Sequence, residues 1–197
     1  EERLELVENL GFNVIAEEPN AIAMVRSLSA TDSQDARLII NMGENSTDLA
    51  VVYNGAPRLI RMIPTGLSSL VRSNLSVQED QARQFILKFG LAPDKLDGQV
   101  LRAIDSTLDN FSSELVKSIK FFQTRYPSVA VSGILLSGFG SAIPQLDGYV
   151  MNKTGVQSIT ADPWQRVQVS QSDQQQLAPI ASEFAIAVGL AQRSNIS

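Results

Sequence analysis

The chain has 197 residues, 44% of them apolar and 19% charged, and its formal net charge is −5 at pH 7. This length and apolar content suffice for one large or two small hydrophobic cores. The net charge is negative and the sequence has no basic stripe, which argues against nucleic acid as the main ligand. Because the sequence contains neither cysteine nor histidine, disulfides, thiol chemistry, the usual zinc sites and histidine-based triads are excluded.

The N-terminal part begins inside a helical pattern, without a methionine, and runs to Gly11 as a C-cap, as in a piece of a longer protein. No apolar run is long enough to span a bilayer, so we expect membrane contact only through partners. Alternation predicts a short strand over Phe12–Ala16, and Pro19 favours a helix over Asn20–Leu28. The polar segment Ser29–Asp35 predicts a domain boundary.

Three β-rich runs follow this boundary and predict an antiparallel meander. They are Arg37–Met42, Asp48–Tyr53 and Arg58–Ile63, joined by turns at Gly43–Ser46 and Asn54–Pro57.

The next segment is predicted to be helical. Helices are expected over Leu67–Asn74 and Val77–Phe89, the second with Ser76 as its N-cap and Glu79 completing a capping box. Apolar residues at steps of three and four then predict one long amphipathic helix over Gln99–Tyr126, packed against the sheet.

The C-terminal third is predicted to begin with a buried strand and to end with a helix. The elements expected there are a strand over Val129–Leu136, a helix near Ala142–Thr154 that contains Pro144, a strand near Val156–Thr160, a polar loop with Trp164, a Gln-rich linker over Ser170–Gln176 and a helix over Pro179–Gln192.

Two glycine-bearing turns are the candidate functional features. Gly43 begins the first turn, and Gly138 and Gly140 lie in the second, between a buried strand and a helix. Glycine lets the backbone approach a ligand closely, turn N–H groups and short hydroxyls can donate to phosphate oxygens, and a helix N-terminus favours negative charge. Each turn is also compatible with a purely structural role, but two such turns after two strands favour a shared ligand.

Three motifs in the correct order resemble those of the actin-like ATPases, which include actin and the cell-division protein FtsA. Residues 41–48 resemble the second phosphate motif, residues 137–144 the adenosine motif, and residues 18–23 the connecting segment. Within this superfamily the chain resembles the PilM family of type IV pilus assembly, through LGFNVIAEEPNAIAMVRSL, QARQFILKFGL, SIKFFQTRYPSVAVSGILLSG and FAIAVGLAQR.

The resemblance implies an α/β fold of the actin-like ATPase (ribonuclease H-like) type, with a mixed sheet and flanking helices. Residues 1–30 would be a remnant of the first actin-like domain and residues 31–197 the second, with an inserted helical and sheet subdomain over approximately residues 60–125.

The resemblance also implies a function. The chain would act as a cytoplasmic scaffold for type IV pilus assembly, with ATP and Mg²⁺ as structural or switching ligands. It would lie at the inner membrane through a partner of the PilN type, bound mainly by the family's N-terminal part, which this sequence lacks. Self-association into a homo-oligomer is compatible with this role.

The nucleotide and metal contacts are assigned by matching positions. Asn41 replaces an acidic residue that in the superfamily helps to hold hydrated Mg²⁺, so we expect weaker metal binding, with Asp48 as a second polar ligand. Glu44 would repel a phosphate unless it turned away, and no residue is a convincing catalytic base, so binding without efficient hydrolysis is favoured. The expected nucleotide contacts are Gly43, Asn45, Ser46, Thr47, Gly138 and Gly140.

Two alternatives stay open from the sequence. One is a nucleotide-free structural module like the cytoplasmic domains of type II secretion, in which Glu44 would point into the cleft and ATP would not affect melting. The other is an actin-like ATPase or kinase with turnover, which would need an acidic residue at or near position 41.

Overall fold

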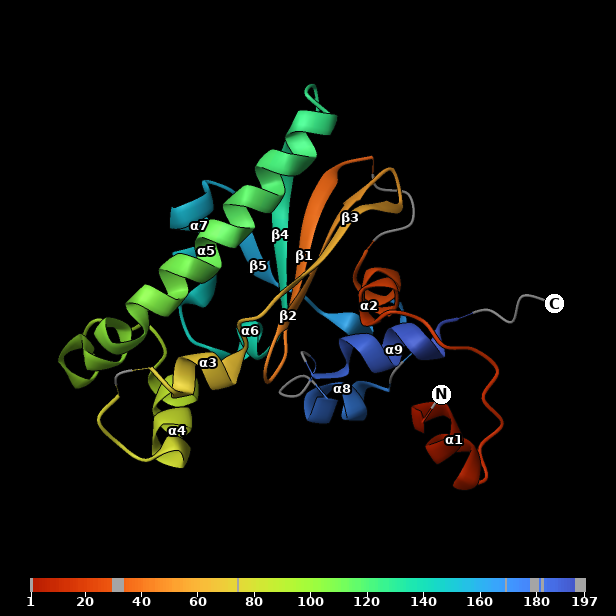
Figure 1. The fold of residues 1–197 in the computed structure, drawn as a ribbon, viewed down its shortest axis with the longest axis horizontal. Coiled ribbons are helices and arrows are strands. Elements are labelled where there is room, and N and C mark those ends of the chain that lie inside the picture. The colour runs from red at the N-terminus through yellow and green to blue at the C-terminus, as the bar shows by residue number, and fades with distance from the viewer. Residues whose placement is uncertain are drawn as a thin grey trace.

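The computed structural model describes residues 2–29, 34–73, 75–168, 170–177, 181 and 183–193. Its centre is a five-stranded mixed sheet in the order β3-β2-β1-β4-β5 (Figure 1). The β1–β2 and β2–β3 pairs are antiparallel, whereas β1–β4 and β4–β5 are parallel. The strands are β1 (Ala36–Met42), β2 (Thr47–Tyr53), β3 (Ala56–Ile63), β4 (Val131–Gly138) and β5 (Ser158–Thr160).

Helices lie on both faces of this sheet, whereas the one at residues 2–9 lies away from it (Figure 1). They are α1 (Glu2–Asn9), α2 (Asn20–Leu28), α3 (Leu67–Val71), α4 (Glu79–Phe89), α5 (Gln99–Arg125), α6 (Phe139–Ala142), α7 (Leu146–Thr154), α8 (Gln171–Leu177) and α9 (Ala185–Ala191), with 3-10 turns at Leu96–Gly98 and Pro163–Arg166.

The sheet separates two hydrophobic cores. Alternate residues of β1 such as Leu38 and Ile40 join the larger core, which α5 and α7 cover together with α3 and α4. Ile39 points to the opposite face and joins the smaller core under α2 and α9 (Figure 1). A strand presents successive side chains to opposite faces, so the apolar run in β1 fills both cores.

The predicted meander and the long helix are confirmed. Asn54 and Gly55 both have positive φ, +50° and +66°, as a two-residue hairpin turn of the Asn-Gly kind requires, so β3 starts two residues earlier than expected. Helix α2 has the predicted bounds, and α5 ends one residue before the predicted end.

Several local predictions are wrong. Phe12–Ala16 forms no strand, and Phe12 and Ile15 are 65% and 76% exposed, because alternation alone supplies no neighbouring strand. The N-cap of α4 is Gln78, without a side-chain cap, and not Ser76. The helix expected near Ala142–Thr154 is interrupted at Pro144, which has no N–H to donate, and α7 starts only at Leu146.

The C-terminal predictions are partly corrected. The Gln-rich segment forms helix α8 instead of a linker, and the last helix starts at Ala185. Pro179, where that helix was expected to start, lies outside the described residues, as do residues 30–33 at the predicted domain boundary. The division into two domains with an inserted subdomain therefore stays a prediction.

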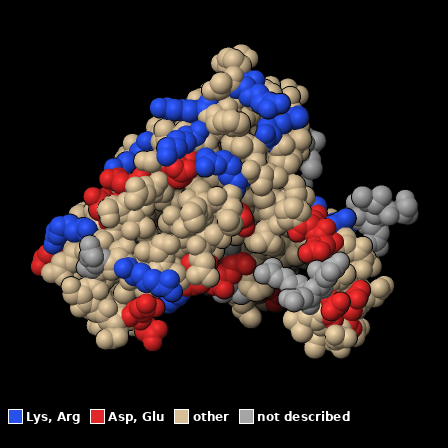
Figure 2. Space-filling model, viewed as in Figure 1, with Lys and Arg blue, Asp and Glu red and all other residues tan. Residues whose placement is uncertain are grey.

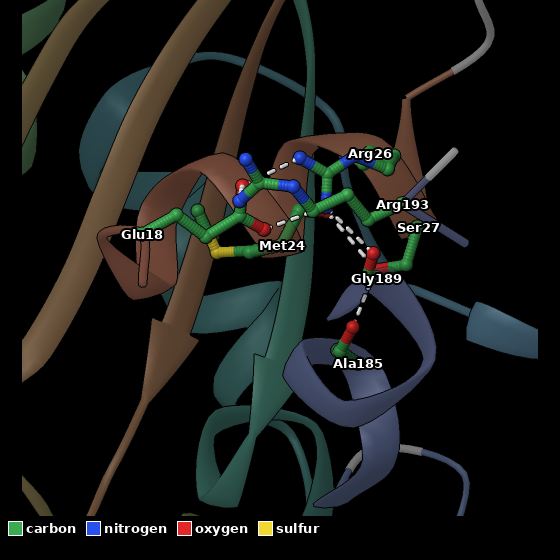
Figure 3. Close-up of polar contacts among 7 residues, drawn as sticks. All are labelled: Glu18, Met24, Arg26, Ser27, Ala185, Gly189 and Arg193. Atoms are coloured by element: carbon green, nitrogen blue, oxygen red, sulfur yellow. Dashed lines mark hydrogen bonds and ion pairs between the residues drawn. The ribbon is translucent and has the colours of Figure 1, made fainter. Parts of the chain in front are cut away.

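Helices α2 and α9 are in direct backbone contact. A Cβ built on Gly189 would lie 1.9 Å from the carbonyl oxygen of Ala23, so only glycine fits at this position. The Ser27 hydroxyl also donates to the carbonyl oxygen of Ala185 at 2.6 Å (Figure 3). Helix α2, which precedes the sheet in sequence, is thereby fixed to α9.

A cluster of charged groups strengthens the same contact. Arg26 donates to Glu18 at 2.6 Å and to the carbonyl oxygen of Gly189 at 2.7 Å, and Arg193 donates to Glu18 at 3.2 Å (Figure 3). The Glu18 side chain is only 9% exposed. The hydrogen bond from Arg26, with the nearby charges of Arg26 and Arg193, lowers the pKa of Glu18 below its usual value.

We expect Gly189→Ala to reduce the free energy of unfolding by about 1–3 kcal/mol, since the new methyl group would force α2 and α9 apart. The control is Gly148→Ala in α7, where a Cβ meets nothing within 4 Å. That change should be neutral or stabilising by about 0.5–1 kcal/mol. Equal effects of the two variants in urea denaturation would contradict the packing described for α9.

We expect Glu18→Gln to cost about 1–3 kcal/mol at pH 7, because it removes a charge-assisted pair with Arg26. The folded pKa of Glu18 is lowered, so its stabilisation is full above the usual glutamate pKa and is lost as the pH falls through the folded pKa. The difference between wild type and variant should therefore shrink on acidification below about pH 4.5. In the control Glu79→Gln, which loses an exposed pair with Arg72, the change should stay below about 1 kcal/mol. A difference for Glu18→Gln that did not depend on pH would contradict the ionic role.

Candidate functional site

The two predicted glycine turns lie together beyond the carboxyl ends of two neighbouring strands of the sheet. Strands β1 and β4 are parallel neighbours, with Asn41 opposite Ser137 and Met42 opposite Gly138. Their carboxyl ends therefore lie side by side, and the turns that follow them face the same region. Ligands of open α/β sheets commonly bind beyond the carboxyl ends of the strands.

Gly138 lies close against the end of β1. Its φ is +64°, and a Cβ built on it would lie 2.3 Å from the carbonyl oxygen of Met42 and 3.0 Å from Oδ1 of Asn41. Gly140 is buried, and its Cβ would come to 3.4 Å from Cβ of Met42. Gly138 is thus needed for the β1–β4 junction itself, and Gly140 packs beneath it.

The first turn is held from both sides. The Gly43 N–H donates to the carbonyl oxygen of Ser46 at 2.8 Å, and the Gly43 carbonyl accepts from the N–H of Leu67 at 3.1 Å. Thr47 is fully buried, and its hydroxyl donates to the carbonyl oxygen of Thr65 at 2.6 Å. Asn45 is exposed at the tip of the turn. The Thr47 hydroxyl thus anchors the turn, while Asn45 is accessible to a ligand.

The two candidate metal ligands lie side by side. Asn41 and Asp48 are directly opposite each other in the β1–β2 ladder, and both are partly buried. They share the face of the sheet that carries Ile39 and Ala50. Within the described part of the chain, no group of three or more acidic, cysteine or histidine side chains is placed to hold a metal ion. An amide and a carboxylate would suit a hydrated Mg²⁺, since Mg²⁺ often takes only one or two carboxylates from the protein.

Glu44 is paired with two residues to which the sequence patterns assign no role. Its carboxylate accepts hydrogen bonds from the Ser68 hydroxyl at the start of α3 and from the guanidinium of Arg83 in α4. These contacts, that of Arg83 first, lower the pKa of Glu44. The guanidinium carbon of Arg83 also lies 5.9 Å from the ring centroid of Phe139, in the second turn. Only the fold brings these residues together, so no short sequence motif could have found them.

The helix that follows Gly138 is shorter than expected. Helix α6 is a single turn, Phe139–Ala142, so its dipole is a weak source of attraction for an anion. The predicted attraction of the helix N-terminus is therefore weak here, so anion binding would depend mainly on local donors. A cavity of about 470 Å³ between α4 and α5, lined by residues such as Val77, Phe85 and Leu96, includes none of the predicted site residues.

The surface over α5 carries mixed charge. Figure 2 shows basic and acidic side chains interleaved along this part of the face. The sequence of α5 itself carries both kinds, for example Asp109, Glu114 and Lys117. Such a surface differs from the continuous basic stripe that neutralises nucleic-acid phosphates. In the described residues, no helix is both long and apolar enough to cross a membrane.

The fold is that of the actin-like proteins. MreB5 of Spiroplasma citri, solved bound to ADP, matches with a TM-score of 0.68 and 15% identity, over 96% of this chain and 63% of that one. An archaeal actin homologue, Ta0583, solved in complex with ADP, matches with a TM-score of 0.55 and 15% identity, over 90% of this chain and 57% of that one.

The family is established by the sequence. The family described as type IV pilus assembly protein PilM matches residues 5–195, and the chain belongs to it. A solved PilM-PilN type IV pilus biogenesis complex matches with a TM-score of 0.81 and 22% identity, over 96% of this chain and 55% of that one. The chain therefore spans little more than half the length of this relative.

Proposed function

We propose that the chain is the nucleotide-binding half of a PilM-like scaffold for type IV pilus assembly, with ATP as a structural or switching ligand. One observation carries the proposal: in a chain of the PilM family, the Gly43 turn and the Gly138 turn lie side by side at the carboxyl ends of β1 and β4. Two structural neighbours are described with bound ADP, which supports a nucleotide as the ligand.

The roles of the residues follow from their positions. Asn45 and Ser46 would present backbone and side-chain donors to the phosphates. Gly43, whose N–H is already donated to the Ser46 carbonyl oxygen, would let the backbone come close to the ligand, while Thr47 holds the turn through Thr65. Gly138 and Gly140 would shape the floor between the turns. Asp48 and Asn41 would orient water around Mg²⁺, whose charge offsets that of the phosphates. Asn41 carries no charge, so the site favours binding over efficient hydrolysis.

The partner would be an inner-membrane pilus protein of the PilN type, by analogy with the PilM-PilN complex. Its contacts would lie mainly in the part of that relative that this chain does not cover. The scaffold would then be cytoplasmic and reach the membrane through that partner. In this arrangement residues 1–30 belong to a first actin-like domain and residues 31–197 to the second.

The test is the coupling between nucleotide and partner, measured on a protein of the relatives' full length that carries this chain. A switching ligand requires the affinity for the cytoplasmic segment of the PilN-type partner to differ with and without ATP and Mg²⁺. Coupling free energies of about 1–3 kcal/mol correspond to factors of roughly 5–150. Equal affinities would contradict the switching role, whereas a loss of partner binding under both conditions would contradict the scaffold itself.

Glu44 favours a second candidate, a nucleotide-free structural module. Its carboxylate lies in the turn that would face phosphate, where it occupies the Ser68 hydroxyl and the Arg83 guanidinium, so these donors are already engaged. This candidate expects ATP to leave the melting temperature unchanged and partner binding to persist without nucleotide.

A further inference from the structure

Arg83 is the link between the two glycine turns. Its guanidinium forms an ion pair with Glu44 in the first turn and lies over the ring of Phe139 in the second. It reaches both turns from α4, which packs with α5 on the face of the sheet that carries the larger core. Arg83 thus contacts one residue of each turn.

The donors around Glu44 resemble those of an anion site. The Ser68 hydroxyl and the Arg83 guanidinium converge on the same oxygen, Oε1 of Glu44. The backbone around them is fixed as well, since the Ser68 N–H donates to the Glu44 carbonyl at 2.8 Å. A guanidinium and a hydroxyl directed at one oxygen are donors that also bind phosphate.

We propose that the Glu44 carboxylate is an internal competitor that occupies, in this chain, the donors of a phosphate-binding subsite formed by Arg83 and Ser68. The ligand class is a phosphate-bearing anion such as a nucleoside polyphosphate. Binding of the ligand releases Arg83 from Glu44, and the Glu44–Arg83 pair thereby sets the affinity of the site. This inference rests on the proposed nucleotide site and adds a regulation built into its first turn.

The test is the affinity for inorganic pyrophosphate, measured by calorimetry on the whole chain. Glu44→Gln removes the competing charge and should raise the affinity at least about five-fold, which is roughly 1 kcal/mol. The double variant Glu44→Gln with Arg83→Gln should lose that gain. Asp94→Asn, which loses an exposed pair with Lys95 at 3.3 Å, is the matched control and should change the affinity less than two-fold, as expected for an exposed charge.

A second variant separates release of Arg83 from the general loss of a charge. Glu44→Asp keeps the charge in the turn but shortens the side chain by one methylene, so it should weaken the contact with Arg83 and still raise the affinity. It also replaces Glu44→Gln if that variant shows no cooperative melting. An affinity unchanged in both Glu44 variants, or a gain that persists without Arg83, would overturn the competitor role.

Failure of the competitor role can be distinguished from failure of the proposed function. A gain of pyrophosphate affinity in the Glu44 variants that depends on Arg83 supports the competitor, even if ATP has no effect on partner binding. Conversely, nucleotide-dependent partner binding together with unresponsive Glu44 variants supports the proposed function and rejects the competitor.

Discussion

Replacing Gly138 by alanine should lower the free energy of unfolding by about 2–6 kcal/mol, the largest effect that we expect at the candidate site. Two costs combine, because φ at this position is +64° and the new Cβ would lie 2.3 Å from the Met42 carbonyl oxygen. A strained left-handed residue costs about 1–3 kcal/mol, and overpacking adds about 1–3 kcal/mol. Urea denaturation of both proteins measures the difference.

The matched control for this change lies in the same strand. Gly133 has no positive φ, and a Cβ there would meet its nearest neighbour, the Gln157 carbonyl oxygen, at 3.9 Å. Gly133→Ala should therefore change the stability by less than about 0.5 kcal/mol, as is usual for surface-like positions. Similar values for the two variants would show that the junction of β1 and β4 tolerates a side chain, against the geometry described.

Phe111→Ala should destabilise the chain by about 3–5 kcal/mol, because a large side chain is removed from a close-packed core. Phe111 is fully buried at the middle of α5, where that helix packs on the sheet. Phe121 lies on the same helix but is 59% exposed, so Phe121→Ala should cost less than about 1 kcal/mol. A comparable loss in both variants, measured by denaturant or thermal unfolding, would contradict the orientation of α5.

Local signals determined which parts of the fold could be predicted. Pro19 indicates the start of α2, and the Asn54-Gly55 pair indicates a hairpin. Apolar residues spaced three and four positions apart indicate α5. The strand at Phe12–Ala16 failed because a strand also needs a partner, which alternation does not reveal. The predicted helix over Ala142–Thr154 is broken because Pro144 lies inside it and proline removes a donor from any helix interior.

In the candidate site too, the features that are local in sequence could be predicted and the long-range contacts could not. The glycine turns were found because each turn is continuous in sequence, and the parallel pairing of β1 with β4 brings them together. The contact of Glu44 with Ser68 and Arg83 joins residues 24 and 39 positions apart. No periodicity or motif encodes such a contact, so the sequence suggested only that Glu44 would be unfavourable beside phosphate.

The most direct test of the central claim is a calorimetric titration of ATP with Mg²⁺ into this chain, beside Asn41→Asp and Gly138→Ala. We expect a dissociation constant below about 1 mM, equivalent to about −4 kcal/mol. Affinity should be higher in Asn41→Asp, because a carboxylate holds Mg²⁺ better than an amide. It should be lost in Gly138→Ala, which is expected to remain folded given the usual stability of about 5–15 kcal/mol. Absence of binding in the wild type and in Asn41→Asp, or unchanged binding in Gly138→Ala, would contradict a nucleotide site between the two glycine turns.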